Sequence, residues 1–176
     1  MPTRVIRDQQ PSSEIQLQAA TLLSEWEQSQ PSGLPPVMPE FRAAYDQFVG
    51  EALSGTQETN LEVADLREIL LDSCGIVIGR AGASGPGRAL RALAEAYQRP
   101  QVAGSQTATQ GKVLLAIQTQ PEAELQMDEL TDITETLQKR LGYDWEMIFG
   151  HGIVPDLAAE LRITFVLAPG ASAQIS

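Results

Sequence analysis

His151 is the only histidine in the chain and the first residue to consider for chemistry, because an imidazole can act as a general base or bind a metal. It stands between two glycines, and no second histidine is present to complete a metal pair. The one cysteine, Cys74, lies far away in the sequence, so an internal disulfide is also excluded. A loop histidine without chemistry is the simpler interpretation, and we predict no catalytic residue and no metal site.

Glycines cluster between residues 79 and 87, at the end of a predicted strand and before a predicted helix. Phosphate-binding loops have a similar arrangement of glycines. However, no lysine follows in the Walker position, and Pro86 removes one N–H donor from the turn. The segment is better interpreted as a structural turn, followed by a solvated helix face that carries Arg88 and Arg91. We therefore predict no bound cofactor.

Three polar residues, Asn60, Glu62 and Asp65, stand where a loop enters a predicted helix. Asparagine is typical of a helix N-cap, and acidic residues in the first turn interact favourably with the helix dipole. On residue types alone, this group stabilises a helix start and needs no further function.

Composition limits the kinds of partner. The chain has 176 residues, a formal net charge of −11 and 43% hydrophobic residues, enough for the core of one domain with additional material. The negative charge disfavours nucleic acid and anionic membrane surfaces. The sequence has neither an apolar run of about 18 residues nor an apolar stretch behind its N-terminus. We predict a cytoplasmic protein that binds another protein and makes no direct membrane contact.

The N-terminal part divides into four segments. We predict a disordered stretch over 1–12, an amphipathic helix over 13–30, a proline-rich linker over 31–38 and a second helix over 39–58. The first helix carries an apolar stripe that could dock a partner, mediate dimerisation or pack back on its own domain. The stripe includes Ile15, Leu22, Leu23 and Trp26.

The rest of the chain alternates helices and strands. From residue 62 the predicted order is helix, strand, helix, strand, helix and two final strands, with a polar loop over 100–111. The alternation in 160–168 indicates a strand buried on one face. This order predicts an α+β fold, a two-layer sandwich with helices packed on a four-stranded mixed sheet and an N-terminal helical extension. Residues 169–176 are expected to be a frayed tail.

Four blocks stand in order between residues 59 and 168, and the last block has several parts: Asn60-Leu61-Glu62-Val63-Ala64-Asp65-Leu66; Gly82-Ala83-Ser84-Gly85-x-x-Arg88-Ala89; Gly111-Lys112-Val113-Leu114-Leu115-Ala116-Ile117; and Met127-Asp128-Glu129-Leu130 with Ile148-Phe149-Gly150, Asp156-Leu157 and Glu160-Leu161-Arg162-Ile163-Thr164. Together they resemble the C-terminal domain of FtsZ, the bacterial tubulin-like division protein. The first block is similar to the family's synergy loop, Asn-x-Asp-Phe-Ala-Asp-Val. Residues 1–58 do not resemble the family's GTP-binding domain, and 39–58 resemble the end of its central helix.

The resemblance implies a partner interface. In the family, the synergy loop of one subunit reaches the GTP of the next subunit in the filament. Asn60 matches the leading asparagine and Asp65 the second acid, whereas Glu62 replaces an aspartate and is one methylene longer. Misplacing a catalytic group by about 1 Å can lower the rate of the catalysed reaction roughly a hundredfold. The resemblance therefore implies that Asn60, Glu62 and Asp65 form a docking interface, which at most contributes in trans to a partner's GTPase activity.

Several functions remain open from the sequence. The leading hypothesis is a stand-alone, non-catalytic module without a nucleotide domain that docks on FtsZ subunits in cell division, as a filament cap or regulator. Alternatives are an FtsZ-derived scaffold or self-associating module with a different protein partner, and a truncated piece of an FtsZ GTPase. An independent enzyme is disfavoured because the sequence offers no nucleophile–base pair.

Overall fold

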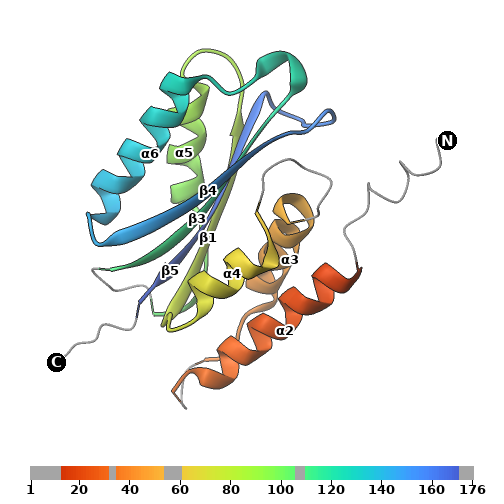
Figure 1. The fold of residues 1–176 in the computed structure, drawn as a ribbon, viewed down its shortest axis with the longest axis vertical. Helices are drawn as coiled ribbons and strands as arrows, with labels where there is room; N and C mark the ends of the chain where they lie inside the picture. The colour runs from red at the N-terminus through yellow and green to blue at the C-terminus, as the bar shows by residue number, and fades with distance from the viewer. Residues whose placement is uncertain (1–12, 32–34, 54–60, 106–109, 171–176) are drawn as a thin grey trace.

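The fold has a central sheet between two layers of helices (Figure 1). The computed structural model describes residues 13–31, 35–53, 61–105 and 110–170. The predicted disorder over 1–12 and the candidate Asn60 lie outside the described residues, as do parts of the predicted linker, of the predicted second helix and of the tail.

The sheet is mixed, as predicted, but it has five strands in the order β2-β1-β5-β3-β4. These strands are β1 (Gly75–Ala83), β2 (Gln101–Gly104), β3 (Gly111–Thr119), β4 (Trp145–Ile153) and β5 (Leu161–Pro169). The last strand, β5, lies between β1 and β3 and is antiparallel to both, whereas β3 and β4 are parallel. Because β5 continues to Pro169, the first residue of the predicted tail lies in a strand.

The additional strand, β2, lies where the sequence predicted only a polar loop. It pairs antiparallel with β1, from Gly75 opposite Gly104 to Ile78 opposite Gln101. Strand formation depends on the neighbouring strand more than on intrinsic propensity. The open backbone groups of β1 therefore recruit a segment whose own composition is weakly β-forming.

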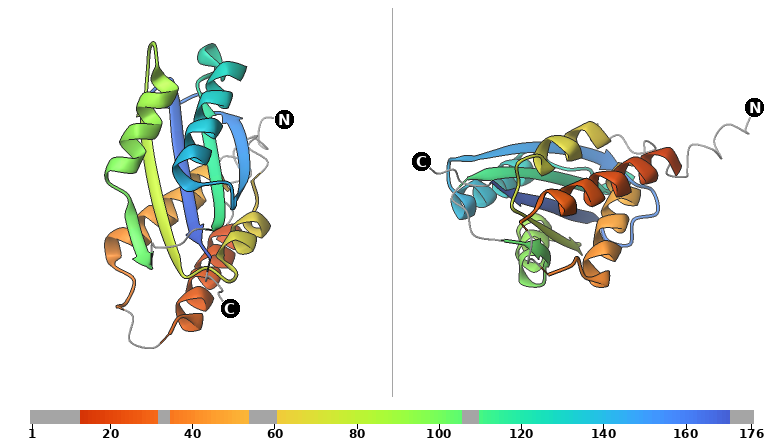
Figure 2. Two further views of the ribbon diagram at one scale, coloured as in Figure 1. Left: turned by 90° about the vertical axis from the view of Figure 1, so that its left-hand side faces the viewer. Right: turned by 90° about the horizontal axis from the view of Figure 1, so that it is seen from below.

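The helices cover both faces of the sheet. One face carries α5 (Arg88–Gln98) and α6 (Met127–Leu141), which form the expected two-layer sandwich (Figure 2). The opposite face is covered by the N-terminal layer, which consists of α2 (Ser13–Ser29), α3 (Pro39–Ala52) and α4 (Val63–Leu70). A short 3-10 helix over Pro121–Ala123 precedes α6.

The third layer changes the burial of β5. The sequence alternation predicted one exposed face for this strand, but Thr164 is only 2% exposed and Val166 is fully buried. Val166 packs in the cluster formed by the N-terminal layer, whereas its neighbour Phe165 packs beneath α5 and α6. The prediction of a half-buried strand was therefore wrong, because helices cover the sheet on both sides.

Gly79 lies where α5 crosses β1 closely. A Cβ atom there would be 2.3 Å from a ring carbon of Phe165 and 2.5 Å from the carbonyl oxygen of Ala96. We expect Gly79→Ala to lower the free energy of unfolding by about 1–3 kcal/mol, because the backbone of α5 must move away. Urea denaturation measures this effect. The control Gly170→Ala has no atom nearer than 3.6 Å. Equal midpoints for the two variants would contradict the close approach.

Candidate docking surface

The N-terminus of α4 holds the two acidic candidates together. Glu62 is the N-cap residue, and its backbone N–H donates to Oδ2 of Asp65 at 2.8 Å. The N–H of Asp65 in turn donates to the carbonyl oxygen of Glu62 at 2.9 Å. The bond from the Glu62 N–H to the Asp65 carboxylate belongs to a capping box, which satisfies backbone donors at the start of α4.

Buried leucines anchor this helix start from beneath. Leu61 is 6% exposed and Leu66 is fully buried, and both belong to the cluster under the N-terminal layer. The side chain of Glu62 is exposed and that of Asp65 is half-buried. The two carboxylates are therefore presented at the surface on a backbone that the core holds in place.

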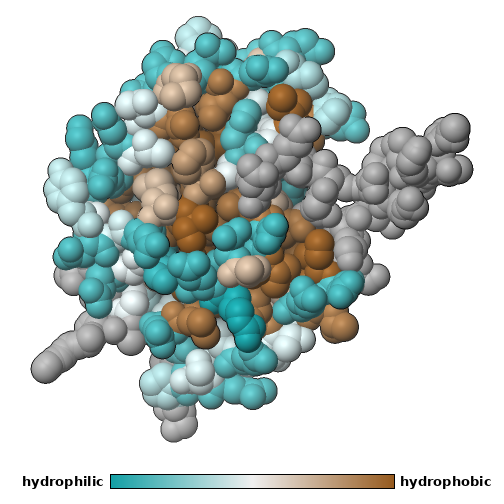
Figure 3. Space-filling view, in the orientation of Figure 1, coloured by the Kyte–Doolittle hydropathy of each residue, from teal (hydrophilic) through white to brown (hydrophobic). Residues whose placement is uncertain are grey.

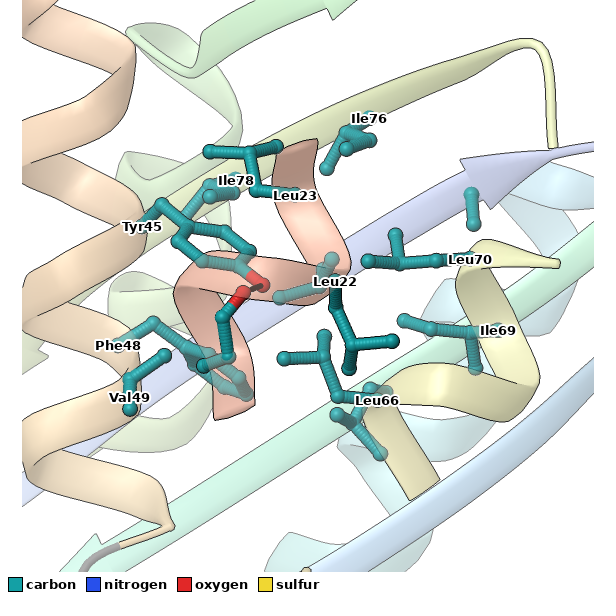
Figure 4. Close-up of a cluster of buried hydrophobic side chains, with 14 of the residues drawn as sticks. Leu22, Leu23, Tyr45, Phe48, Val49, Leu66, Ile69, Leu70, Ile76 and Ile78 are labelled. Carbon is teal, nitrogen blue, oxygen red and sulfur yellow. Dashed lines mark hydrogen bonds between the residues drawn. The ribbon is translucent and has the colours of Figure 1, made fainter. Parts of the chain in front are cut away.

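The apolar stripe of α2 is turned toward the core of the same chain. Leu22, Leu23 and Trp26 are at most 8% exposed, and Ile15 packs against the same cluster. Figure 4 shows Leu22 and Leu23 among side chains of α3, α4 and β1. The alternative that this stripe packs on its own domain is therefore the arrangement observed.

Hydrogen bonds reinforce the packing of α2. Nε1 of Trp26 donates to Oγ of Ser73 at 2.8 Å and to the carbonyl oxygen of Ser73 at 3.2 Å. The phenol of Tyr45 donates to the carbonyl oxygen of Ala19 at 2.6 Å. Burial raises the pKa of Tyr45 well above its ordinary value of 10.0, with a smaller contribution from Asp46. The phenol therefore stays a hydrogen-bond donor at all physiological pH values.

The glycine-rich turn is occupied by charged groups of the chain itself. The N–H of Gly85 donates to Oε1 of Glu160 at 3.0 Å, and the Arg91 guanidinium donates to carbonyl oxygens of Ser84 and Pro86. These contacts hold the strand-to-helix turn in shape. They agree with its interpretation as a structural turn.

Arg88 does not lie on a solvated helix face, in contrast to the expectation from the sequence. It is 7% exposed, and its Nε and Nη2 donate to the two carboxylate oxygens of Glu129 at 2.7 and 2.9 Å. These hydrogen bonds lower the pKa of Glu129, although burial opposes them. The Glu129 carboxylate also caps α6, because its Oε1 accepts from the N–H of Gln126. Arg88 thus joins α5 to α6.

His151 lies on β4 with a neighbouring hydroxyl. Its Nε2 is 3.3 Å from Oγ1 of Thr119, and its side chain is half-buried. Among the residues that the structure describes, no group of three histidine, cysteine or carboxylate side chains is placed to hold a metal ion. No described helix is both long enough and apolar enough to cross a bilayer.

Sequence reasoning missed a groove at the end of the sheet where β3 and β4 begin. Trp26 and Ser29 of α2 line one side, and the turn from α4 to β1, including the half-buried Cys74, lines another. The N-terminal ends of β3 and β4 complete the groove. Its lining residues come from distant parts of the chain, so no local pattern in the sequence could reveal it.

Comparison with known proteins places the fold. No protein-family model matches the sequence. The architecture is the α+β fold of the FtsZ/tubulin C-terminal domain. It is similar to an FtsZ dimer structure from M. jannaschii, with 17% identity and a TM-score of 0.55 over 82% of this chain and 47% of that chain. A point mutant of FtsZ from the same organism gives 17% identity and a TM-score of 0.53, over 79% and 43%.

This likeness agrees with the resemblance noted in the sequence and confirms the fold expected from it. The chain spans less than half the length of these FtsZ structures. At this level of identity, the comparison establishes a shared fold.

Proposed function

We propose that this domain acts in or on bacterial cell division by docking onto FtsZ subunits, as a non-catalytic filament cap or regulator. The observation that carries the proposal is the start of α4, where Glu62 and Asp65 stand at the surface over buried Leu61 and Leu66. By resemblance, this is the loop that meets the nucleotide end of the next FtsZ subunit. The FtsZ-like fold supports the same placement.

The geometry favours binding over chemistry. Oδ2 of Asp65 already accepts the N–H of Glu62, so this oxygen holds the start of α4 in shape. A preorganised helix start loses little conformational entropy on association, which favours docking. A molecule bound in this way would cover the nucleotide end of a filament subunit and prevent further addition there. The scaffold alternative is less well supported, because the α2 stripe is packed inward.

The test is co-sedimentation of polymerising FtsZ with increasing amounts of the protein. We expect the pelleted polymer and the GTP turnover to fall as the protein approaches equimolar amounts. The double variant Glu62→Gln, Asp65→Asn removes both charges but keeps an oxygen at 65 that can accept the capping N–H. We expect that at least about tenfold more of this variant is required to lower the pelleted polymer by the same amount. This corresponds to a loss of about 1.4 kcal/mol in binding free energy.

The matched control is the double variant Asp128→Asn, Asp132→Asn, which also removes two exposed carboxylate charges, from α6 on the other face of the sheet. It should behave like the unmodified protein. Unchanged polymer mass and GTP turnover at excess protein would refute the docking proposal. An equal loss of effect in the control variant would show that net charge acts instead of the α4 surface.

A further inference from the structure

No strand in the described part of the chain pairs with the outer edge of β4. β4 is the last strand of the sheet and pairs with β3 alone. Such an edge presents backbone N–H and C=O groups that can pair with another strand. The opposite edge is formed by β2, which has only four residues and is therefore a poor template.

β4 lacks the features that protect edge strands. Residues 145–153 contain no lysine, arginine or proline, and Glu146 is their one acidic residue. Phe149 is 45% exposed, and Trp145, Met147 and Ile148 are half-buried. In Figure 3, apolar side chains gather in the band between α6 and α4, where β4 runs. An unprotected edge of this kind is a template for pairing with another strand.

The accessible part of this edge has definite limits. Residues 145–149 form its one uninterrupted stretch of exposed or half-buried residues, and beyond it the buried Gly150 and Gly152 alternate with the half-buried His151 and Ile153. The parallel register places Val113 beside Met147 and Leu115 beside Phe149. Neighbours in register share a face of the sheet, so Trp145, Met147 and Phe149 lie on the side of α5 and α6. Glu146 and Ile148 lie on the other side.

We propose that β4 pairs antiparallel with the β4 of a second copy of this chain, about a twofold axis at Met147. A twofold axis perpendicular to a sheet pairs residues that lie on the same face. The stretches 145–149 of the two copies overlap most when the twofold axis passes through their midpoint, Met147. The proposal is independent of any docking on FtsZ.

This register is self-complementary in residue type. It sets Trp145 opposite Phe149 of the second copy, twice over, and aromatic pairs across strands are favourable. Met147 faces its own counterpart at the axis. Glu146 stands opposite the second copy's Ile148, so no two carboxylates face each other directly. A register centred on Glu146 would place like charges opposite each other and is disfavoured. The sheet would then continue across both copies.

The first test is the mass in solution, measured by size-exclusion chromatography with light scattering over a range of concentrations. We expect a dimer, because a twofold interface closes after two copies. Phe149→Lys should raise the dissociation constant at least about tenfold, since it replaces an aromatic contact with a buried charge. The matched control Leu90→Lys alters a residue of similar exposure, 43%, on α5 and should remain dimeric. A monomer at every concentration, or equal effects of both variants, would overturn the proposal.

The second test determines the register by disulfide trapping in a Cys74→Ser background. Met147→Cys places two thiols directly opposite at the axis, within the range that a disulfide spans. It should give a covalent dimer on a non-reducing gel. Phe149→Cys is the control, because two copies of residue 149 would be roughly 13 Å apart along the strands. Although Phe149 is more exposed, its cysteine variant should stay monomeric on the gel. The reverse result would exclude this register.

Discussion

Replacing Trp26 with alanine should lower the free energy of unfolding by about 3–5 kcal/mol, one of the two largest effects of a single substitution expected here. Trp26 is 6% exposed and packs in the cluster beneath the N-terminal layer. The substitution leaves a large cavity and removes the hydrogen bonds from Nε1 to Ser73. Urea denaturation followed by far-ultraviolet circular dichroism measures the change without depending on the lost fluorophore.

Two further variants of α2 separate the causes. Trp26→Phe keeps most of the apolar volume but loses the indole N–H, so it should cost about 1–2 kcal/mol. Leu17→Ala alters a side chain of the same helix that is 67% exposed, and it should change the free energy by less than about 0.5 kcal/mol. If Trp26→Ala were as mild as Leu17→Ala, α2 would not belong to the core. Its stripe would then be available to a partner.

The elements with strong local patterns could be predicted from the sequence. The stripe of α2 and the alternation of β5 follow from residue spacing alone, and both elements are present in the structure. Periodicity shows that a face is apolar but not what covers it. For this reason, the sequence could not decide whether Trp26 docks a partner or packs internally. It also could not predict that the second face of β5 is buried.

Long-range partners explain the other differences. β2 forms because β1 offers an open edge, and Arg88 is buried because Glu129 reaches it from another helix. β1 and Glu129 are not adjacent in sequence to the segments they contact. An interpretation from composition therefore assigned β2 to a loop and placed Arg88 on a solvent-exposed helix face. The acidic pair of the candidate site was found by resemblance. Its capping geometry needed the structure, because Glu62, and not a residue before it, is the N-cap.

Replacing Arg88 with alanine should also lower the free energy of unfolding by about 3–5 kcal/mol near neutral pH, because the substitution leaves the Glu129 carboxylate without its guanidinium. The side chains of Arg88 and Glu129 are only 8% and 20% exposed, so solvent cannot fully replace the lost hydrogen bonds. The more exposed Glu160, at 41%, contributes a weaker contact at 3.5 Å. Chemical denaturation at a series of pH values measures the difference between the two proteins.

The pH dependence identifies the ion pair as the cause. Arg88 holds the pKa of Glu129 below its ordinary value of 4.5 in the folded protein. A carboxyl group lowered in this way adds stability above its unfolded pKa and loses it as the pH falls through the folded pKa. The difference in the free energy of unfolding between Arg88→Ala and the unmodified protein should therefore become smaller below about pH 4.5. In the control Arg91→Ala, an exposed arginine one turn away is lost, and the difference should stay small at every pH. An Arg88→Ala deficit that persists unchanged in acid would show that Arg88 acts through packing instead of charge.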